Sequence, residues 1–423
     1  MGDPLFPRHS VWPAVDHLID ADTLAVVERD AAAADVRGAV ADEVMRAIKD
    51  TGYCGLPIPA AFGGSAASLV ECCAVQRALG RVNPGLAVAL NMHLFSVGVL
   101  VEHWRARQDE SWLLMEAVAT QRRLVANAFA EPALAGALSR STCVAVRGDT
   151  TWTISGTKTP CSLARRADLV CFQAEVDGSD GELVLCLVPL DAEGVRAHAS
   201  WDALGMRCSE SDTLVFEECR VPDQLVFHRG RQAADGAGTG PLTAGLVWFC
   251  LTIAAVYLGL AERALGETAA GLHQAKVRPL GAGRHELTSY QAEFGALVSR
   301  LAVLDAACES AARVATTGPG GAAAALDLAL AVKHEVCQGT HEIVNAACGL
   351  TGAGAYRNDS PMSRLLRDSV AARFHPPTRQ ATTQILGRRA LGLPAPLELF
   401  EVPADHDRLL DRINGHHPAR VTS

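Results

Sequence analysis

An uncharged run in the second half of the chain constrains the fold more than any other feature. Residues 242–261 read LTAGLVWFCLTIAAVYLGLA, which matches the roughly 20 apolar residues that a membrane-spanning helix needs. Glu262 and Arg263 continue the same helical pattern, and no cluster of positive charge marks either end. We therefore expect a helix buried in a bundle, where it contacts other helices or a ligand, and we expect no membrane partner and no second span elsewhere.

The residue pattern divides the chain into three parts and a tail. Apolar residues at three- and four-residue spacing predict a helical domain over residues 1–125. Short runs rich in Val, Thr and Leu, such as TWTISGTK and DLVCFQAEV, lie between Gly, Asp and Ser turns and predict a small antiparallel β domain over residues 126–235. Long helical patterns return over residues 236–390. The fold class is therefore α+β, in the order α, β, α.

The tail, residues 391–423, is rich in Pro and polar residues. We expect a poorly packed extension, or alternatively a strap on a neighbouring subunit. Its adjacent pair His416 and His417 is expected to be solvated.

Composition and charge exclude several classes of function. The formal net charge is -9 and the Lys and Arg residues are scattered, so no basic stripe favours nucleic acid as a partner. The first residues carry early charges and no apolar core of signal-peptide length, which predicts a cytoplasmic protein. The 13 cysteines include no CxxC pair and have no His at ligand spacing, so we expect buried reduced thiols and no metal site.

Four motifs occur in a recognisable order along the chain. They are ANAFAEP at 126–132, SGTKT at 155–159, LGMRCSESDTLVFEECRVP at 204–222 and SPMSRLLRDS at 360–369. Together with the α, β, α order, this set resembles the acyl-CoA dehydrogenase superfamily of flavoproteins from about residue 20 to 390. The resemblance implies a C-terminal four-helix bundle, FAD bound between that bundle and the β domain, an acyl thioester stacked on the flavin ring, and a homodimer or homotetramer.

The base that this family uses is missing from the sequence. In the commonest pattern, a Glu before a Gly-Thr pair removes the α-proton of the thioester. The stretch RFHPPTRQ matches that pattern at Thr378, and Pro376 stands where the Glu is expected. Some relatives carry the Glu on the apolar helix, at a position that falls near Phe249, where only Cys250 and Tyr257 can titrate. We expect Phe249 and Pro376 to line the substrate pocket.

His375 is the candidate replacement for the base. It is adjacent to the lost position, and an imidazole can take a proton near neutral pH. A His before two prolines at a helix end can instead cap carbonyls or fill the pocket wall, and Pro376 and Pro377 can shape the pocket as a rigid turn without any base. The residues leave both interpretations open.

The resemblance also implies the cofactor contacts. Pro160 replaces a Trp that packs on the flavin, and Ser162 keeps a hydroxyl where relatives have a Thr near the flavin N5. Losing the Trp opens that face of the ring to a bulkier substrate or to oxygen. The other expected contacts are FAD-binding Thr378, Gln380, Gly352, Gly354 and Arg278, with Arg284 as the alternative to Arg278; substrate-binding Glu131; and a structural ion pair, Arg367–Asp368, that ties helices together.

Three functions follow from this set. The first, favoured by a small margin, is a flavin oxidoreductase that acts on an acyl thioester held by CoA or by an acyl carrier protein in specialised metabolism, with an atypical or missing catalytic base. The second is a flavin monooxygenase that transfers oxygen to an amine or a carbon. The third is a catalytically silent flavoprotein. An electron-transfer flavoprotein or a flavin reductase is the expected redox partner.

Overall fold

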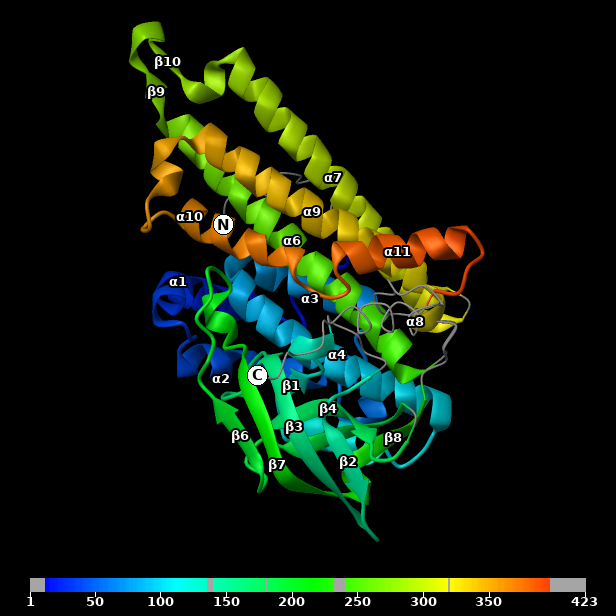
Figure 1. The fold of residues 1–423 in the computed structure, drawn as a ribbon. Helices are drawn as coiled ribbons and strands as arrows, with labels where there is room; N and C mark the ends of the chain where they lie inside the picture. Colours follow the sequence, from blue (N-terminus) through cyan, green and yellow to red (C-terminus); the bar gives the residue numbers. More distant parts are fainter. Residues whose placement is uncertain (1–11, 135–139, 180, 232–239, 319, 396–423) are drawn as a thin grey trace, which may run out of the picture.

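The computed structural model describes residues 12–134, 140–179, 181–231, 240–318 and 320–395. Helices open and close the chain and strands fill its middle (Figure 1), which confirms the predicted fold class and order. The amino-terminal start, most of the tail and the His416–His417 pair lie outside the described residues.

The first helical part ends where the sheet begins. Its helices are α1 (Ala21–Arg37), α2 (Asp42–Asp50), α3 (Leu69–Val82), α4 (Pro84–Arg107) and α5 (Trp112–Thr120). Local signals set their starts, because Asp20 caps α1, Ser68 and Glu71 form a capping box at α3, and Asn83 caps α4 just before a proline.

The middle part is one sheet with the strand order β6-β7-β3-β2-β4-β5-β8. Its strands are β1 (Val125–Ala128), β2 (Val144–Arg147), β3 (Thr151–Cys161), β4 (Leu169–Val176), β5 (Glu182–Pro189), β6 (Val195–His198), β7 (Asp212–Pro222) and β8 (Val226–Arg231). Most pairs are antiparallel, as predicted, but β1 and β2 both pair with β4 in parallel. The sheet is therefore mixed, because β1 enters it directly from the helical part and runs beside β4 instead of forming a hairpin.

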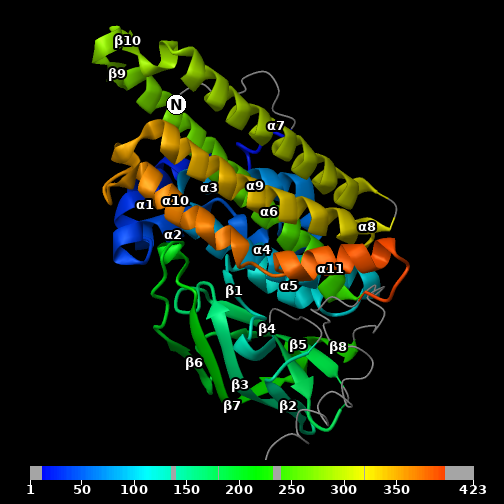
Figure 2. The ribbon, with the colours of Figure 1, turned by 45° about the horizontal axis from the view of Figure 1, so that its top comes forward.

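The second helical part forms a layer on the other side of α3 and α4 from the sheet (Figures 1 and 2). Its helices are α6 (Pro241–Gln274), α7 (Thr288–Thr317), α8 (Gly321–Ala324), α9 (Leu326–Thr351), α10 (Pro361–Val370) and α11 (Arg379–Ala390), and a short hairpin, β9 (Lys276–Val277) and β10 (Ala282–Gly283), joins α6 to α7. Helix α7 lies on the outer face of this layer in both views.

Helix α6 carries the uncharged run and lies at the centre of the molecule. It packs against α3 so closely that a Cβ on Gly80 would lie 2.2 Å from the Val256 carbonyl oxygen, and a Cβ on Gly259 would lie 2.1 Å from the Arg77 oxygen. Only glycine permits backbones to approach this closely.

Two helices are long and apolar enough to cross a membrane by length and composition, which corrects the expectation of a single such run. They are α4 and α6, and the apolar windows of the two helices are 94% and 100% buried inside the protein. Such burial is typical of core helices. All 13 cysteines are free and 12 of them are buried, which confirms the prediction of reduced core thiols.

Candidate active site

A row of aromatic rings connects the three parts of the molecule. The ring centroids of Phe129 and Phe95 are 5.2 Å apart, those of Phe95 and Phe249 are 5.6 Å apart, and those of Phe249 and His375 are 6.4 Å apart. Phe129 follows β1, Phe95 lies on α4, Phe249 lies on α6, and His375 lies in the turn before α11. The predicted substrate contact Phe249 and the predicted base His375 are therefore neighbours.

The imidazole of His375 is hydrogen-bonded within the protein. Its Nε2 lies 2.7 Å from the hydroxyl oxygen of Tyr257, which is fully buried on α6. Burial, together with the positive charge of Lys333, lowers the pKa of His375 to about 3. A neutral imidazole with so low a pKa is a weak proton acceptor at neutral pH, which opposes the hypothesis that His375 serves as a general base.

Lys333 holds the turn that carries the two prolines. Its buried ammonium, on α9, donates to the carbonyl oxygens of His375 at 2.5 Å and Pro377 at 2.8 Å. Thr378 follows as the N-cap of α11, where its hydroxyl accepts from the Ala381 N–H at 3.4 Å. Lys333 and the N-cap of α11 therefore fix the turn that contains Pro376. The other predicted contact, Gln380 in the first turn of α11, is exposed.

Three serines, one that follows the SGTKT motif and two in the LGMRCSES segment, form a buried hydrogen-bonded chain. Ser162, just past β3, lies 2.8 Å from Ser211, which lies 2.7 Å from Ser209. The same loop packs on α10, because the Met206 N–H donates to the Asp368 carboxylate at 2.6 Å. The structure therefore joins the SGTKT, LGMRCSES and SRLLRDS motifs at one place, next to the predicted flavin contact Ser162.

Arg367 and Asp368 do not pair with each other, which corrects the predicted ion pair. Arg367 forms a two-pronged salt bridge with Asp35 of α1 and donates to the Leu204 carbonyl. Asp368 turns the other way, because successive residues of a helix point to different faces. Each residue still ties α10 to another element, so the structural role holds with different partners.

Arg364, one turn before Asp368, has two N–H donors without an acceptor among the described residues. Its Nε and Nη1 atoms are buried, and neither has a partner among the described residues. A buried guanidinium costs free energy unless an anion or an acceptor satisfies it. This position therefore suits an anionic group such as a phosphate.

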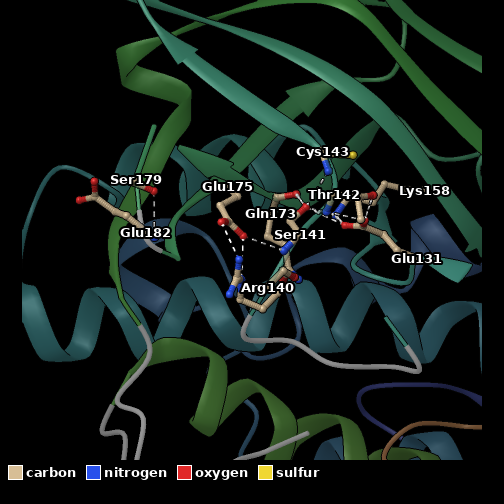
Figure 3. Close-up of polar contacts among 10 residues, drawn as sticks. All are labelled: Glu131, Arg140, Ser141, Thr142, Cys143, Lys158, Gln173, Glu175, Ser179 and Glu182. Atoms are coloured by element: carbon tan, nitrogen blue, oxygen red, sulfur yellow. Dashed lines mark hydrogen bonds and ion pairs between the residues drawn. The ribbon is translucent and has the colours of Figure 1, made fainter. Parts of the chain in front are cut away.

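Glu131 braces the β domain (Figure 3). Its carboxylate accepts from the Lys158 ammonium at 2.5 Å, from the Ser141 hydroxyl at 2.6 Å and from the Thr142 N–H at 2.7 Å. Burial opposes ionisation, yet Lys158 and these donors keep the pKa of Glu131 below its ordinary value. Both oxygens already have partners within the protein, so the side chain expected to contact substrate is engaged in holding β3.

The predicted adenine-side contacts lie at the other end of α9. Gly352 ends this helix with a φ of +86°, and Arg284 reaches the same helix end, where it donates to the Thr351 carbonyl at 3.1 Å. Arg278 is exposed in the neighbouring hairpin, and Gly354 follows in a 3-10 turn. Lys333 and Gly352 are separated by roughly 28 Å along α9, at ~1.5 Å per residue. Within one chain, these glycines therefore lie far from His375.

A cleft of about 560 Å³ opens where α4 ends and α6 begins. Side chains from the end of α4, from β8 and from the start of α6 line it. Its charged side chains are Arg105, Arg107, Arg229, Arg231 and Glu102, and the imidazoles of His103 and His228 also line it. Arg105 pairs with Glu102 and Arg229 with Glu182, whereas Arg107 forms no ion pair with any described residue. Burial, His103 and Arg107 lower the pKa of His228 to about 4, as a positively charged environment does.

The cleft and the aromatic row lie on the same faces of two helices. Leu242 precedes Phe249 by seven residues on α6, and Glu102 follows Phe95 by seven residues on α4. Seven residues are two helical turns, or about 10 Å along the axis. Two short basic stretches, HWRAR on α4 and FHRGR on β8, are the sequence signal of this cleft, but their distance along the chain hides that they meet.

Three family models match almost the whole described chain. They are the acyl-CoA dehydrogenase N-terminal domain over residues 23–117, the middle domain over residues 126–219 and the C-terminal domain over residues 236–391. These matches follow the same three-part division as the structure.

Similar proteins include both oxygenases and dehydrogenases. Isobutylamine N-hydroxylase of Streptomyces viridifaciens is 27% identical over 86% of this chain and 92% of its own length. The putative acyl-CoA dehydrogenase YdbM of Bacillus subtilis is 25% identical over 86% of this chain and 93% of its own length. The structure of KijD3 in complex with FMN and dTDP-3-amino-2,3,6-trideoxy-4-keto-3-methyl-D-glucose has a TM-score of 0.79 and 26% identity, covering 90% of this chain and 95% of that one.

Proposed function

Because the chain belongs to the acyl-CoA dehydrogenase family of flavin-dependent enzymes, we propose that it is a flavin-dependent monooxygenase that hydroxylates an amine. One oxygen atom of O₂ enters the amine to give a hydroxylamine and the other leaves as water, at the expense of two electrons and two protons. Similarity to an amine N-hydroxylase over most of the chain supports this reaction class.

The state of His375 is the observation that carries the proposal. Removing the α-proton of a thioester needs a base of suitable pKa beside the substrate. Here Pro376 takes the place of the family's Glu, and the His375 ring is neutral, hydrogen-bonded to Tyr257 and held at a low pKa. An amine nitrogen attacks oxygen with its own lone pair, so oxygen transfer to it needs no base of this kind.

The residues around Ser162 suit a flavin. The hydroxyl of Ser162 in the β domain and that of Thr378 in the C-terminal helical part can each form a hydrogen bond with a flavin. The unpaired donors of Arg364 suit a phosphate. Reduced flavin, when bound, supplies the two electrons that O₂ takes up.

The form of the flavin and its supply belong to the same proposal. FAD is the form expected from the family, whereas KijD3 is described with FMN. If FAD binds, Gly352, Gly354 and Arg278 or Arg284 contact its adenine half from a second copy of the chain in a homodimer or homotetramer. We propose a separate flavin reductase as the electron source and a cytoplasmic location, in keeping with 13 free cysteines.

The cationic cleft is the candidate entrance for the substrate. Its excess of arginines favours a substrate that carries negative charge about 10 Å from the amine. A phosphorylated or nucleotide-linked amine meets this requirement.

The second candidate is oxidation of an acyl thioester on CoA or on an acyl carrier protein, with an electron-transfer flavoprotein as the acceptor. Similarity to the putative acyl-CoA dehydrogenase YdbM favours it, and the phosphates of CoA or phosphopantetheine also suit the cleft. It requires a base other than the family's Glu.

Two assays on the purified full chain separate the candidates. The first supplies a flavin reductase, NADH and either FMN or FAD in air, and follows a panel of anionic and neutral primary amines by mass spectrometry. The second titrates the flavin-loaded protein without oxygen with acyl-CoA and acyl-carrier thioesters and follows the flavin absorbance.

The proposal expects an amine product that gains one oxygen atom, labelled when ¹⁸O₂ is used, and no bleaching by thioesters. Bleaching without oxygen and no oxygenated amine would overturn it in favour of the thioester oxidoreductase. Failure of both assays with flavin still bound would point to a silent flavoprotein.

A further inference from the structure

The contact between Tyr257 and His375 determines where the imidazole proton lies. The Tyr257 hydroxyl is fully buried, and burial raises its pKa well above the ordinary value, so it keeps its proton. A buried hydroxyl needs an acceptor for that proton. Among the described residues, His375 Nε2 at 2.7 Å is the acceptor that the hydroxyl contacts. Tyr257 therefore donates, and Nε2 accepts.

A neutral imidazole has one donor and one acceptor nitrogen. Since Nε2 accepts from Tyr257, the ring proton must lie on Nδ1. The ammonium of Lys333, which donates to the His375 carbonyl at 2.5 Å, adds a positive charge that disfavours a second ring proton. Nδ1 has no hydrogen-bond partner within the part of the chain that the structure describes, and the side chain is only half-buried.

We infer that Tyr257 is a positioning residue that fixes His375 as a neutral imidazole with its proton on Nδ1, so that His375 donates a hydrogen bond to the reacting group. The inference deepens the proposed function and rests on it only for the identity of that group. Phe249 packs edge-on against the ring at a centroid distance of 6.4 Å and limits its rotation. Tyr257 and Phe249 thus restrain the imidazole, and Lys333 holds the backbone of the same residue.

A fixed donor has a use in oxygen transfer that a base does not have. When a nucleophile takes one oxygen atom of an O–O bond, negative charge develops on the other oxygen atom. A preorganised N–H group stabilises such charge without having to reorient during the reaction. Oriented in this way, His375 supports oxygen transfer even though its basicity is suppressed.

The tautomer can be read directly, without flavin and without turnover. Long-range ¹H–¹⁵N spectra of the full chain labelled with ¹⁵N-histidine distinguish the two ring nitrogens, and the His375→Gln variant assigns the signal. We expect His375 to show an Nδ1–H tautomer that stays neutral down to pH 5. Tyr257→Phe removes the donor to Nε2, so we expect the Nε2–H form to gain population and the pKa of His375 to rise.

Tyr53→Phe is the matched control. Tyr53 is also a fully buried tyrosine, but its hydroxyl contacts Gln76 and the Leu90 carbonyl instead of a histidine. This variant is expected to lose similar stability and to leave the His375 signals unchanged. An Nε2–H tautomer in the unmodified protein, or an unchanged tautomer in Tyr257→Phe, would overturn the inference.

Kinetics separate this inference from the proposed function. In the amine assay, Tyr257→Phe is expected to lower kcat about 10-fold with little change in KM, because one oriented donor is worth at least about 1.4 kcal/mol. If the tautomer is Nδ1–H and no amine is hydroxylated, the proposed function fails and the positioning role of Tyr257 stands. If amines are hydroxylated and the tautomer is Nε2–H, the proposed function stands and the positioning role of Tyr257 fails.

Discussion

At the scale of single residues, two buried carboxylates differ in how well the protein stabilises their charged form. Glu131 is paired with Lys158, and both side chains are completely shielded from solvent. Asp368 is just as buried but accepts from the Met206 N–H, with its charge only partly offset by neighbouring arginines. The first carboxylate is therefore stabilised as an anion, whereas the second is not.

Removing the Glu131 charge should destabilise the β domain. Glu131→Gln leaves the Lys158 ammonium buried without a counter-ion, which typically costs about 3–5 kcal/mol. Urea unfolding measures the change in the free energy of unfolding. Glu217→Gln is the control, because its pair with Arg196 is exposed and worth less than about 1 kcal/mol. Equal effects in the two variants would contradict the structural role of Glu131.

Asp368 should make stability depend on pH in a predictable direction. Burial raises its pKa to about 6, while an unfolded Asp titrates near ~3.9. Between these values the folded protein holds a proton that the unfolded chain has lost, so the stability from this group falls as pH rises from about 4 to 6.

Asp368→Asn removes that titration and keeps an oxygen acceptor for Met206. Relative to the unmodified protein, the variant should gain roughly 3 kcal/mol in unfolding free energy between pH 4 and pH 7, the equivalent of about two pKa units. Urea midpoints at the two pH values test this. Asp50→Asn, at an exposed carboxylate, serves as control, and a parallel pH dependence in all three proteins would refute the expectation.

At the scale of elements, close helix packing positions the site. Helix α6 carries Tyr257 and Phe249, and it lies directly against α3 and α4, an approach that depends on glycines at the contacts. The same helix has a glycine, Gly266, with open space beside it. The two kinds of glycine should respond oppositely to an added methyl group.

Gly259→Ala should destabilise the protein and Gly266→Ala should not. At Gly259 the new Cβ would lie 2.1 Å from a backbone oxygen of α3, which forces the helices apart at a cost of about 1–3 kcal/mol or more. At Gly266 alanine is the better helix former by about 1 kcal/mol. Thermal unfolding of both variants checks the sign, and equal shifts would show that α3 and α6 are not in this close contact.

At the scale of the whole molecule, the candidate site residues come from all three parts. The sheet contributes Ser162, α4 contributes Phe95, and the C-terminal helices contribute Phe249, Tyr257 and His375. The cationic cleft also forms between parts, from α4, β8 and α6. Both candidate features therefore exist only in the assembled chain.

Neutralising the cleft should weaken the binding of anionic substrates. Arg107→Gln removes a cation that has no ion pair among the described residues, so we expect KM for an anionic amine to rise about 10-fold at low salt, the loss of one charge-assisted contact. The effect should shrink as salt screens the charge. Arg196→Gln, on β6 outside the cleft, should leave KM unchanged, and equal KM values for all three proteins would exclude the cleft as an entrance.

Much of this protein follows from local sequence. Hydrophobic period and turn residues determined the α, β, α order, because both signals act within a few residues. The motif resemblance also pointed to Ser162, Phe249 and His375 as candidates and predicted that the family's Glu is missing. Helix α4 escaped notice as a second long apolar helix, because its asparagine, histidines and C-terminal charges interrupt the uncharged pattern that marks α6.

Only the tertiary structure decided what those residues do. Tyr257 and His375 are 118 positions apart, and Glu131 and Lys158 meet from different motifs, so no spacing along the chain predicts either contact. Arg367 and Asp368 are neighbours in sequence yet point to different elements. The pKa of a side chain depends on burial and on charges brought together by folding. For that reason the sequence identified His375 as a candidate base, and only the packed structure placed its ring against Tyr257 and lowered its pKa.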